Sequence, residues 1–134
     1  MAITAVTGGM AVTALFPGLR GDVESGVTMT AMEVLAWLLI GHAIADFALQ
    51  TEWMALAKQP GRKFDGEVIW PTVLTWHAAI HAGAVKLATG SWLLAGLEFA
   101  AHAAIDYARG RGRLSFNADQ AAHVGCKLLW SALA

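Results

Sequence analysis

The sequence predicts an all-α protein, a polytopic membrane bundle of four transmembrane helices. A fifth helix at the N-terminus is an alternative that the sequence does not decide. Three observations support this fold class. Of the 134 residues, 57% are hydrophobic and only 14% are charged, whereas an ordinary soluble domain has about 25% charged residues. Four apolar stretches are each close to the roughly 20 residues that cross a bilayer. Each stretch also carries ionisable side chains four residues apart, a spacing that places them on one face of a helix.

The first expected helix covers about Met29–Gln50 and contains an uncharged run from Val34 to Ala45. Residues 1–28 precede it as an N-terminal arm or an extra helix, and residues 29–134 form the four-helix transmembrane domain. The apolar start of the chain has no basic flank and is therefore not typical of a signal peptide.

The other three expected helices cover Val68–Val85, Ser91–Ala108 and Asn117–Ala134. Pro71 falls near the first turn of its helix, where proline is tolerated. Asn117, with Gln120 three residues later, resembles a capping box and predicts where the last helix begins.

Basic residues are concentrated in two connections, which lie on the same side of a four-helix hairpin bundle. They are Lys58, Arg62 and Lys63 in the first connection and Arg109, Arg111 and Arg113 in the third. The positive-inside rule then places both connections in the cytoplasm.

The composition also excludes several classes of protein. A net charge of −1 argues against a basic nucleic-acid-binding domain, and we expect no nucleic acid partner. The single cysteine, Cys126, excludes an internal disulfide framework and a cysteine-rich zinc site. The sequence contains no glycine-rich phosphate loop of the two common types and no G-x-S-x-G nucleophile elbow.

Nine ionisable residues interrupt the four apolar stretches, and they include all five histidines. In helix order they are His42 and Asp46, His77 and His81, Glu98, His102 and Asp106, and Asp119 and His123. Such groups in a membrane helix normally face the bundle interior. With a rise of 1.5 Å per residue, one histidine of each helix lies about 9–13 Å from the cytoplasmic end, and His81 and Glu98 lie deeper, at roughly 16–20 Å.

Imidazole and carboxylate ligands together suit a divalent metal such as Zn, Mn or Fe. We therefore expect a metal site near the cytoplasmic side, formed by His42, Asp46, His77, His81, His102, Asp106, Asp119 and His123. Glu98 is the candidate catalytic residue, as a general base. The ligands exceed what one metal needs, which fits either two metals or one metal with outer carboxylates that orient the histidines. A proton or ion path and a purely structural polar network remain alternative uses of the same residues.

The segment Gly41–Thr51, followed by Trp53, Met54 and Lys58, resembles the opening motif of the domain-of-unknown-function 3307 family, small predicted membrane proteins of bacteria and their phages. The later pieces match the family's pattern in the same order: His77-x-x-x-His81, Glu98-x-x-x-His102-x-x-x-Asp106, and Asp119-Gln120-x-x-His123. The resemblance covers about Val34 to Leu129. It implies an integral protein of the bacterial inner membrane, and it implies no activity.

Two functions from different classes follow from these observations. The first is a metal-dependent hydrolase of a lipid-linked substrate, a phosphate or an ester, reached at the inner leaflet. The second is a non-catalytic phage or bacterial membrane component that acts through partners or oligomerisation, in which the polar network is structural. The expected partners are the lipid bilayer and, in a homo-oligomer, further copies of the chain.

Overall fold

The computed structural model describes residues 29–134, so the expected arm or extra helix over residues 1–28 lies outside the described residues. The described part is all-α, as predicted. Its elements are α2 (Ala31–Ala43), which continues as the π-helix η2 (Ile44–Ala48), then α3 (Glu52–Ala57), α4 (Trp70–Thr89), α5 (Trp92–Gly110) and α6 (Phe116–Leu133). The four long helices agree with the predicted ranges to within a few residues, and the short α3 was not predicted.

Local side-chain caps explain where the helices begin. Thr30 forms a complete capping box with Glu33 at the start of α2, and Ser91 caps α5. The predicted cap of the last helix at Asn117 is wrong. Ser115 caps α6 instead, because its hydroxyl accepts a hydrogen bond from the backbone N–H of Ala118 at 3.2 Å. A serine cap satisfies one of the backbone donors that the first turn of a helix leaves free.

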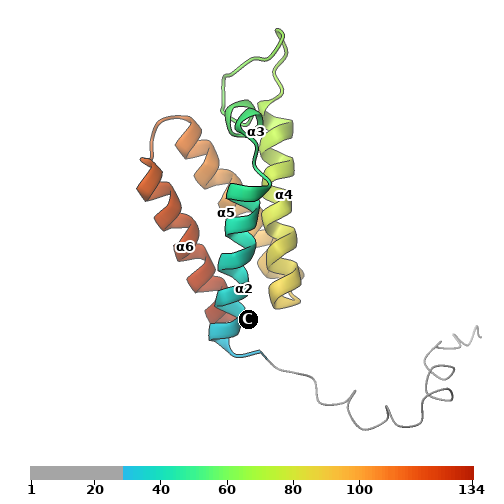
Figure 1. Cartoon of the computed structure of the whole chain (residues 1–134), viewed down its shortest axis with the longest axis vertical. Coiled ribbons are helices and arrows are strands. Elements are labelled where there is room, and N and C mark those ends of the chain that lie inside the picture. Colours follow the sequence, from blue (N-terminus) through green and yellow to red (C-terminus); the bar gives the residue numbers. More distant parts are fainter. Residues whose placement is uncertain (1–28) are drawn as a thin grey trace, which may run out of the picture.

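The four long helices run alternately up and down and form a ring in the order α2, α4, α5, α6 (Figure 1). Each of them packs against its two neighbours in this ring, and the α4–α5 hairpin is the most closely packed pair. Gly90, with a left-handed φ of 69°, ends α4 and allows the tight turn into α5. The side chains that fill the middle of the ring therefore come from all four helices.

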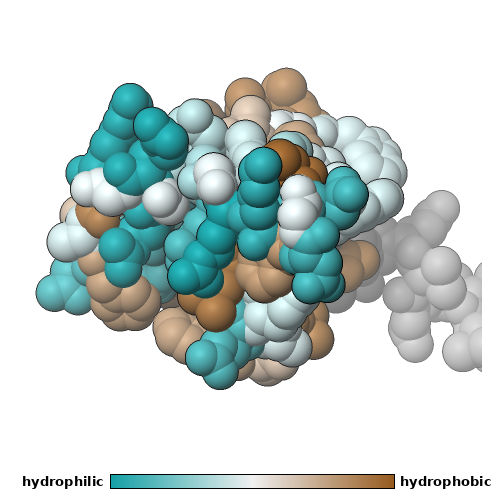
Figure 2. Space-filling model, turned by 90° about the horizontal axis from the view of Figure 1, so that it is seen from above, coloured by the Kyte–Doolittle hydropathy of each residue, from teal (hydrophilic) through white to brown (hydrophobic). Residues whose placement is uncertain are grey.

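Polar and apolar side chains are distributed in an unusual way. The buried apolar cluster is small and consists of Val34, Leu38, Val85, Ala88, Leu94 and Trp130. The rest of the interior holds a few alanines and Leu74 together with histidine, carboxylate, lysine and serine side chains. Many large apolar side chains lie outside: Leu87 is 88% exposed and Trp76 67%. Hydrophilic residues gather at the end of the bundle that carries α3 and the long loop, which Figure 2 shows from above.

One described helical segment, Ala31–Ala48, has both the length and the apolar composition needed to cross a membrane. Core helices of soluble proteins and signal sequences share this length and composition.

Candidate metal centre

All nine ionisable residues that the sequence placed on the helix faces point into the bundle, and each of their side chains is at most 8% exposed. The five imidazole rings converge. His102 stacks on His81 with ring centroids 3.6 Å apart and on His123 at 4.2 Å. His77 lies 4.7 Å from His81, and His42 lies 5.1 Å from His81.

His81 lies among the other rings although its position along α4 is one turn deeper than that of His77. In a helix the Cα–Cβ bonds tilt toward the N-terminus. His81 therefore leans toward the start of α4, and His102, on the antiparallel α5, leans in the opposite direction. The two side chains therefore approach each other along the bundle axis. A depth calculated from the helical rise locates only the backbone and does not include this extension of the side chains.

Asp46 lies in the π-helical turn η2, where the backbone N–H of Leu49 donates to the carbonyl of Ile44 at 2.9 Å. Such wide turns occur frequently at functional sites. The carboxylate of Asp46 faces three histidines from two helices. Its Oδ1 is 3.1 Å from His81 Nε2 and 3.2 Å from His77 Nε2, and its Oδ2 is 3.4 Å from His42 Nε2.

Asp106 of α5 makes a similar set of contacts and shares His77 with Asp46. Its Oδ2 is 3.5 Å from both His77 Nε2 and His102 Nε2, and its Oδ1 is 3.7 Å from His123 Nε2. Lys58, which follows α3, donates from Nζ to the same Oδ2 at 2.6 Å. One carboxylate oxygen thus faces two imidazoles and an ammonium group.

Six of the nine residues form two groups whose ligand atoms lie within 4.8 Å of one another. The first group is Asp46, His77, His81 and His102, and the second is His102, Asp106 and His123. In a tetrahedral site with bonds of 2.0–2.1 Å, neighbouring ligand atoms are about 3.4 Å apart. Within the first group, Asp46 Oδ1 is 3.1 Å from His81 Nε2 and 3.2 Å from His77 Nε2, close to this value.

The hydrogen bonding of the rings also fits a metal. Six buried ring nitrogens lack a hydrogen-bond partner: His42 Nε2, both nitrogens of His77, both nitrogens of His102, and His123 Nε2. Buried polar atoms without partners are rare in native proteins because they lose hydration without compensation. Coordination of one or two divalent ions would satisfy several of these nitrogens at once.

His42, Asp119 and Glu98 lie outside the two ligand groups. His42 Nδ1 is 3.4 Å from His81 Nδ1, which suits a role in orienting the His81 ring. Glu98 has both carboxylate oxygens engaged: Lys127 donates to Oε1, and Trp130 Nε1 donates to Oε2 at 2.7 Å. Glu98 Oε1 is also 3.4 Å from His102 Nδ1, the usual place of a carboxylate that orients a metal-bound histidine.

Lys127, Trp130 and Lys58 are not among the site residues predicted from the sequence. Lys127 could have been found, because it lies four residues after His123 and continues the Asp119–His123 face of the helix. Lys58 follows the short helix α3, and no periodic pattern marks such a position.

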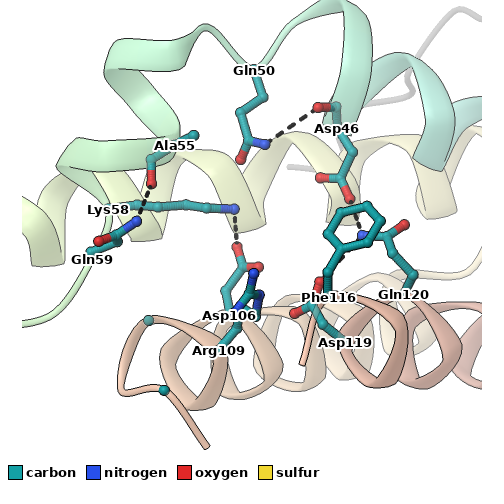
Figure 3. Close-up of a pocket in the computed structure, with 12 residues that line it drawn as sticks. Asp46, Gln50, Ala55, Lys58, Gln59, Asp106, Arg109, Phe116, Asp119 and Gln120 are labelled. Carbon is teal, nitrogen blue, oxygen red and sulfur yellow. Dashed lines mark hydrogen bonds and ion pairs between the residues drawn. The ribbon is translucent and has the colours of Figure 1, made fainter. Parts of the chain in front are cut away.

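A pocket of about 380 Å³ lies beside the metal-ligand groups, at the end of the bundle that carries α3 and the basic loops. Figure 3 shows Lys58 and Arg109 near Asp106 on one side, and Asp119 and Gln120 on the other. The pocket is lined by residues from η2, α3, α5, α6 and the segments that connect them. They are Asp46, Gln50, Ala55, Lys58, Gln59, Asp106, Arg109, Gly110, Gly112, Phe116, Asp119 and Gln120. Ligand-group and cationic residues therefore share one pocket.

Comparison with protein-family models gives a match over residues 34–132 to the family described as "Protein of unknown function (DUF3307)". This range contains all nine ionisable residues of the bundle interior, and the match confirms the resemblance seen in the sequence. No curated protein and no solved structure matches the chain.

Proposed function

The chain belongs to the DUF3307 family, whose description states no function, and from the site itself we propose that it is an integral membrane protein with a buried divalent-metal centre. The observation that carries the proposal is the convergence of histidine and aspartate side chains from the four long helices into two ligand groups. A structural polar network would hold its buried nitrogens in hydrogen-bond geometry. Here six ring nitrogens lack that geometry, although carboxylate oxygens lie 3.2–3.7 Å from five of them, an arrangement that supports ligands gathered around an ion.

Three features support a polytopic position in the bilayer. Ten of the 21 buried residues are polar or charged while many large apolar side chains are exposed, a distribution unlike that of a soluble domain. The 20 residues of α4 span about 30 Å, the thickness of the hydrocarbon core. The basic connections lie at one end of the bundle, which the positive-inside rule assigns to the cytoplasmic face of a bacterial inner membrane. The interior charges of α5 and α6 and the two histidines of α4 lower the hydropathy of these helices, so that within residues 29–134 Ala31–Ala48 is the one segment apolar enough to cross a membrane by composition.

The residues that would hold the metal are Asp46, His77, His81, His102, Asp106 and His123. Zn, Mn and Fe suit this mixture of imidazole and carboxylate ligands. His102 belongs to both groups, so the set fits two neighbouring ions or one ion with the remaining carboxylate as an outer partner. His42 and Glu98 would orient His81 and His102 from behind.

We further propose a hydrolytic activity on a lipid-linked substrate that enters from the inner leaflet. A bound divalent ion lowers the pKa of a water molecule and polarises a substrate oxygen. The chain supplies Asp119, whose Oδ1 is buried without a hydrogen-bond partner and which lines the pocket. In hydrolysis the water oxygen joins the phosphorus or acyl carbon, the bond to the leaving oxygen breaks, and Asp119 passes the proton from water to that oxygen. Asp119 suits this proton transfer better than Glu98, because Lys127 and Trp130 already donate hydrogen bonds to both carboxylate oxygens of Glu98.

A non-catalytic membrane component is the second candidate. An apolar groove of about 320 Å³ between α2 and α4 favours it, because a neighbouring helix or a second copy of the chain could pack there. Gly41, Ala84 and Ala88 in this groove are small enough for close helix packing.

Metal analysis of the detergent-purified protein tests the proposal. We expect about one or two equivalents of Zn, Mn or Fe, reduced by substitution of His77→Ala or His81→Ala. Met54→Ala, a substitution in α3 outside both ligand groups, is the control and should keep the metal content of the parent protein. Undiminished metal content in both histidine variants, or no metal in the parent protein, would refute the metal centre.

The membrane position has its own test. Single cysteines at Arg62 and Arg111, introduced into a Cys126→Ser background, should react with an impermeant maleimide only after the cytoplasmic side is opened. Labelling from the periplasmic side of intact cells would contradict the orientation.

A further inference from the structure

Lys58 lines the pocket and forms an ion pair with Asp106, a residue of the proposed metal site. Its Nζ donates to Asp106 Oδ2 at 2.6 Å, and this same oxygen is 3.5 Å from His77 Nε2 and from His102 Nε2. The Lys58 side chain is 14% exposed and lines the pocket, so its ammonium group is within reach of a ligand bound there. A divalent ion that takes Asp106 as a ligand weakens the attraction between Asp106 and Lys58, and the ammonium group then becomes available to another anion.

Arg109 provides a second cation on the same wall of the pocket (Figure 3). Its Nη1 donates to the carbonyl of Leu114 at 3.1 Å, and a guanidinium group has five N–H donors in all. The first two turns of α6 contribute Phe116, Asp119 and Gln120 to the lining. The positive end of the dipole of this 18-residue helix therefore lies at the pocket as well.

The charge of the pocket depends on the metal. Three carboxylates (Asp46, Asp106 and Asp119) and two cations (Lys58 and Arg109) line it, which gives a formal charge of −1. Each divalent ion raises this charge by two, so the pocket is positive with one ion bound. An anion with several oxygens could then contact the metal, the ammonium group and the guanidinium group together.

We propose that this pocket binds the phosphate group of the substrate between Lys58 and Arg109, beside the metal centre. The inference rests on the proposed function and adds the substrate class to it. A phosphate offers enough oxygens to contact the metal and both cations at once, whereas a carboxylate has only two. Arginine and lysine at a helix N-terminus form a common environment for a phosphate group.

The test measures phosphate binding and metal content on the same full-length, detergent-purified, zinc-loaded protein. Calorimetric titration with inorganic phosphate should give binding that acetate does not reproduce. Lys58→Met should weaken phosphate binding about 10- to 100-fold, the usual loss for a hydrogen bond to a charged group. Lys58→Arg should retain most of the binding, because it keeps the cation. Lys86→Met is the matched control at the opposite end of α4 and should bind phosphate like the parent protein.

Competition with lipids identifies the source of the phosphate. If phosphatidic acid in nanodiscs displaces inorganic phosphate and phosphatidylcholine does not, the natural ligand is a lipid phosphomonoester. If neither lipid displaces inorganic phosphate, the natural ligand is a water-soluble phosphate. Either result supports the phosphate site. Equal phosphate binding by Lys58→Met and Lys86→Met, or no phosphate binding by metal-loaded protein, would overturn the inference while the metal centre stands. Absence of metal from the parent protein would overturn both.

Discussion

The two ends of the bundle hold buried polar groups in opposite ways. At the end where α2 begins and α6 finishes, Leu38, Val85 and Leu94 pack into an apolar cluster, and the neighbouring Glu98 has partners on both oxygens. At the end with α3 and the basic loops, buried imidazole nitrogens lack partners and face two aspartates beside a pocket. The same four helices thus provide a region whose buried polar side chains are paired and a region whose buried ring nitrogens could bind a ligand.

This difference separates the polar residues that stabilise the fold from those that we propose bind a ligand. A buried ion pair with complete hydrogen bonding contributes to the integrity of the native state, and removal of one partner is costly. Buried polar groups without partners destabilise the ligand-free protein, and they contribute most to the free energy of binding when a ligand pairs with them. Substitutions at the two ends should therefore change different measured quantities.

The largest effect is expected for the histidine shared by the two ligand groups. His102→Ala removes a ligand from both groups, so the purified protein should retain less than about a tenth of the metal of the parent protein. His42→Ala removes only an orienting contact and should lower metal affinity about tenfold. Metal titrations monitored by atomic emission measure both. A larger loss in His42→Ala than in His102→Ala would contradict the assignment of ligands.

The ion pair at the closed end should affect stability more than metal binding. Lys127→Met leaves Glu98 buried beside Trp130 without its cation, which should lower the free energy of unfolding by about 3–5 kcal/mol. The double variant Glu98→Gln/Lys127→Met should recover most of this loss. Denaturant unfolding in detergent, followed by circular dichroism, measures both variants. An unstable double variant would show that the pair has a role beyond mutual neutralisation.

A purely apolar substitution sharpens the comparison further. Leu38 is 1% exposed within the apolar cluster, and Leu38→Ala should cost about 2 kcal/mol of stability. We expect the lower part of the usual range because, in the bilayer position proposed above, lipid surrounds the helices and the hydrophobic driving force between them is small. Metal content should equal that of the parent protein. Loss of metal in this variant would show that the two ends are energetically coupled.

The smallest effect concerns the loop that places Lys58 over the pocket. A Cβ added at Gly110 would lie 2.5 Å from Pro60 Cδ, so Gly110→Ala should displace the connection that follows Lys58. We expect a loss of about 1 kcal/mol in stability together with weaker phosphate binding. Gly96→Ala is the matched control in the same helix, because nothing lies within 4 Å of its added Cβ. Unchanged phosphate binding in Gly110→Ala would show that the loop does not position Lys58.

The helices and their polar faces could be predicted because each depends on local, periodic sequence features. The spacing of Glu98, His102 and Asp106 places them on one face of any α-helix, whatever surrounds it. The π-turn at Asp46 and the attachment of Lys58 to Asp106 could not be predicted, since both depend on contacts between segments far apart in the sequence. The cap at Ser115 was available in the sequence, but the Asn117–Gln120 pattern obscured it.

The interior charges of the last two helices bear on how the chain enters a bilayer. Among the described segments, Ala31–Ala48 alone is long and apolar enough to cross a membrane by length and composition. α5 carries Glu98 and α6 carries Lys127, and a charged residue at the centre of a helix adds about 2.5–3.5 kcal/mol to the cost of insertion by the translocon. The two charges neutralise each other only when the helices are side by side. In a chain that crosses the bilayer as proposed, α5 and α6 therefore leave the translocon together, with their ion pair formed before lipid surrounds them.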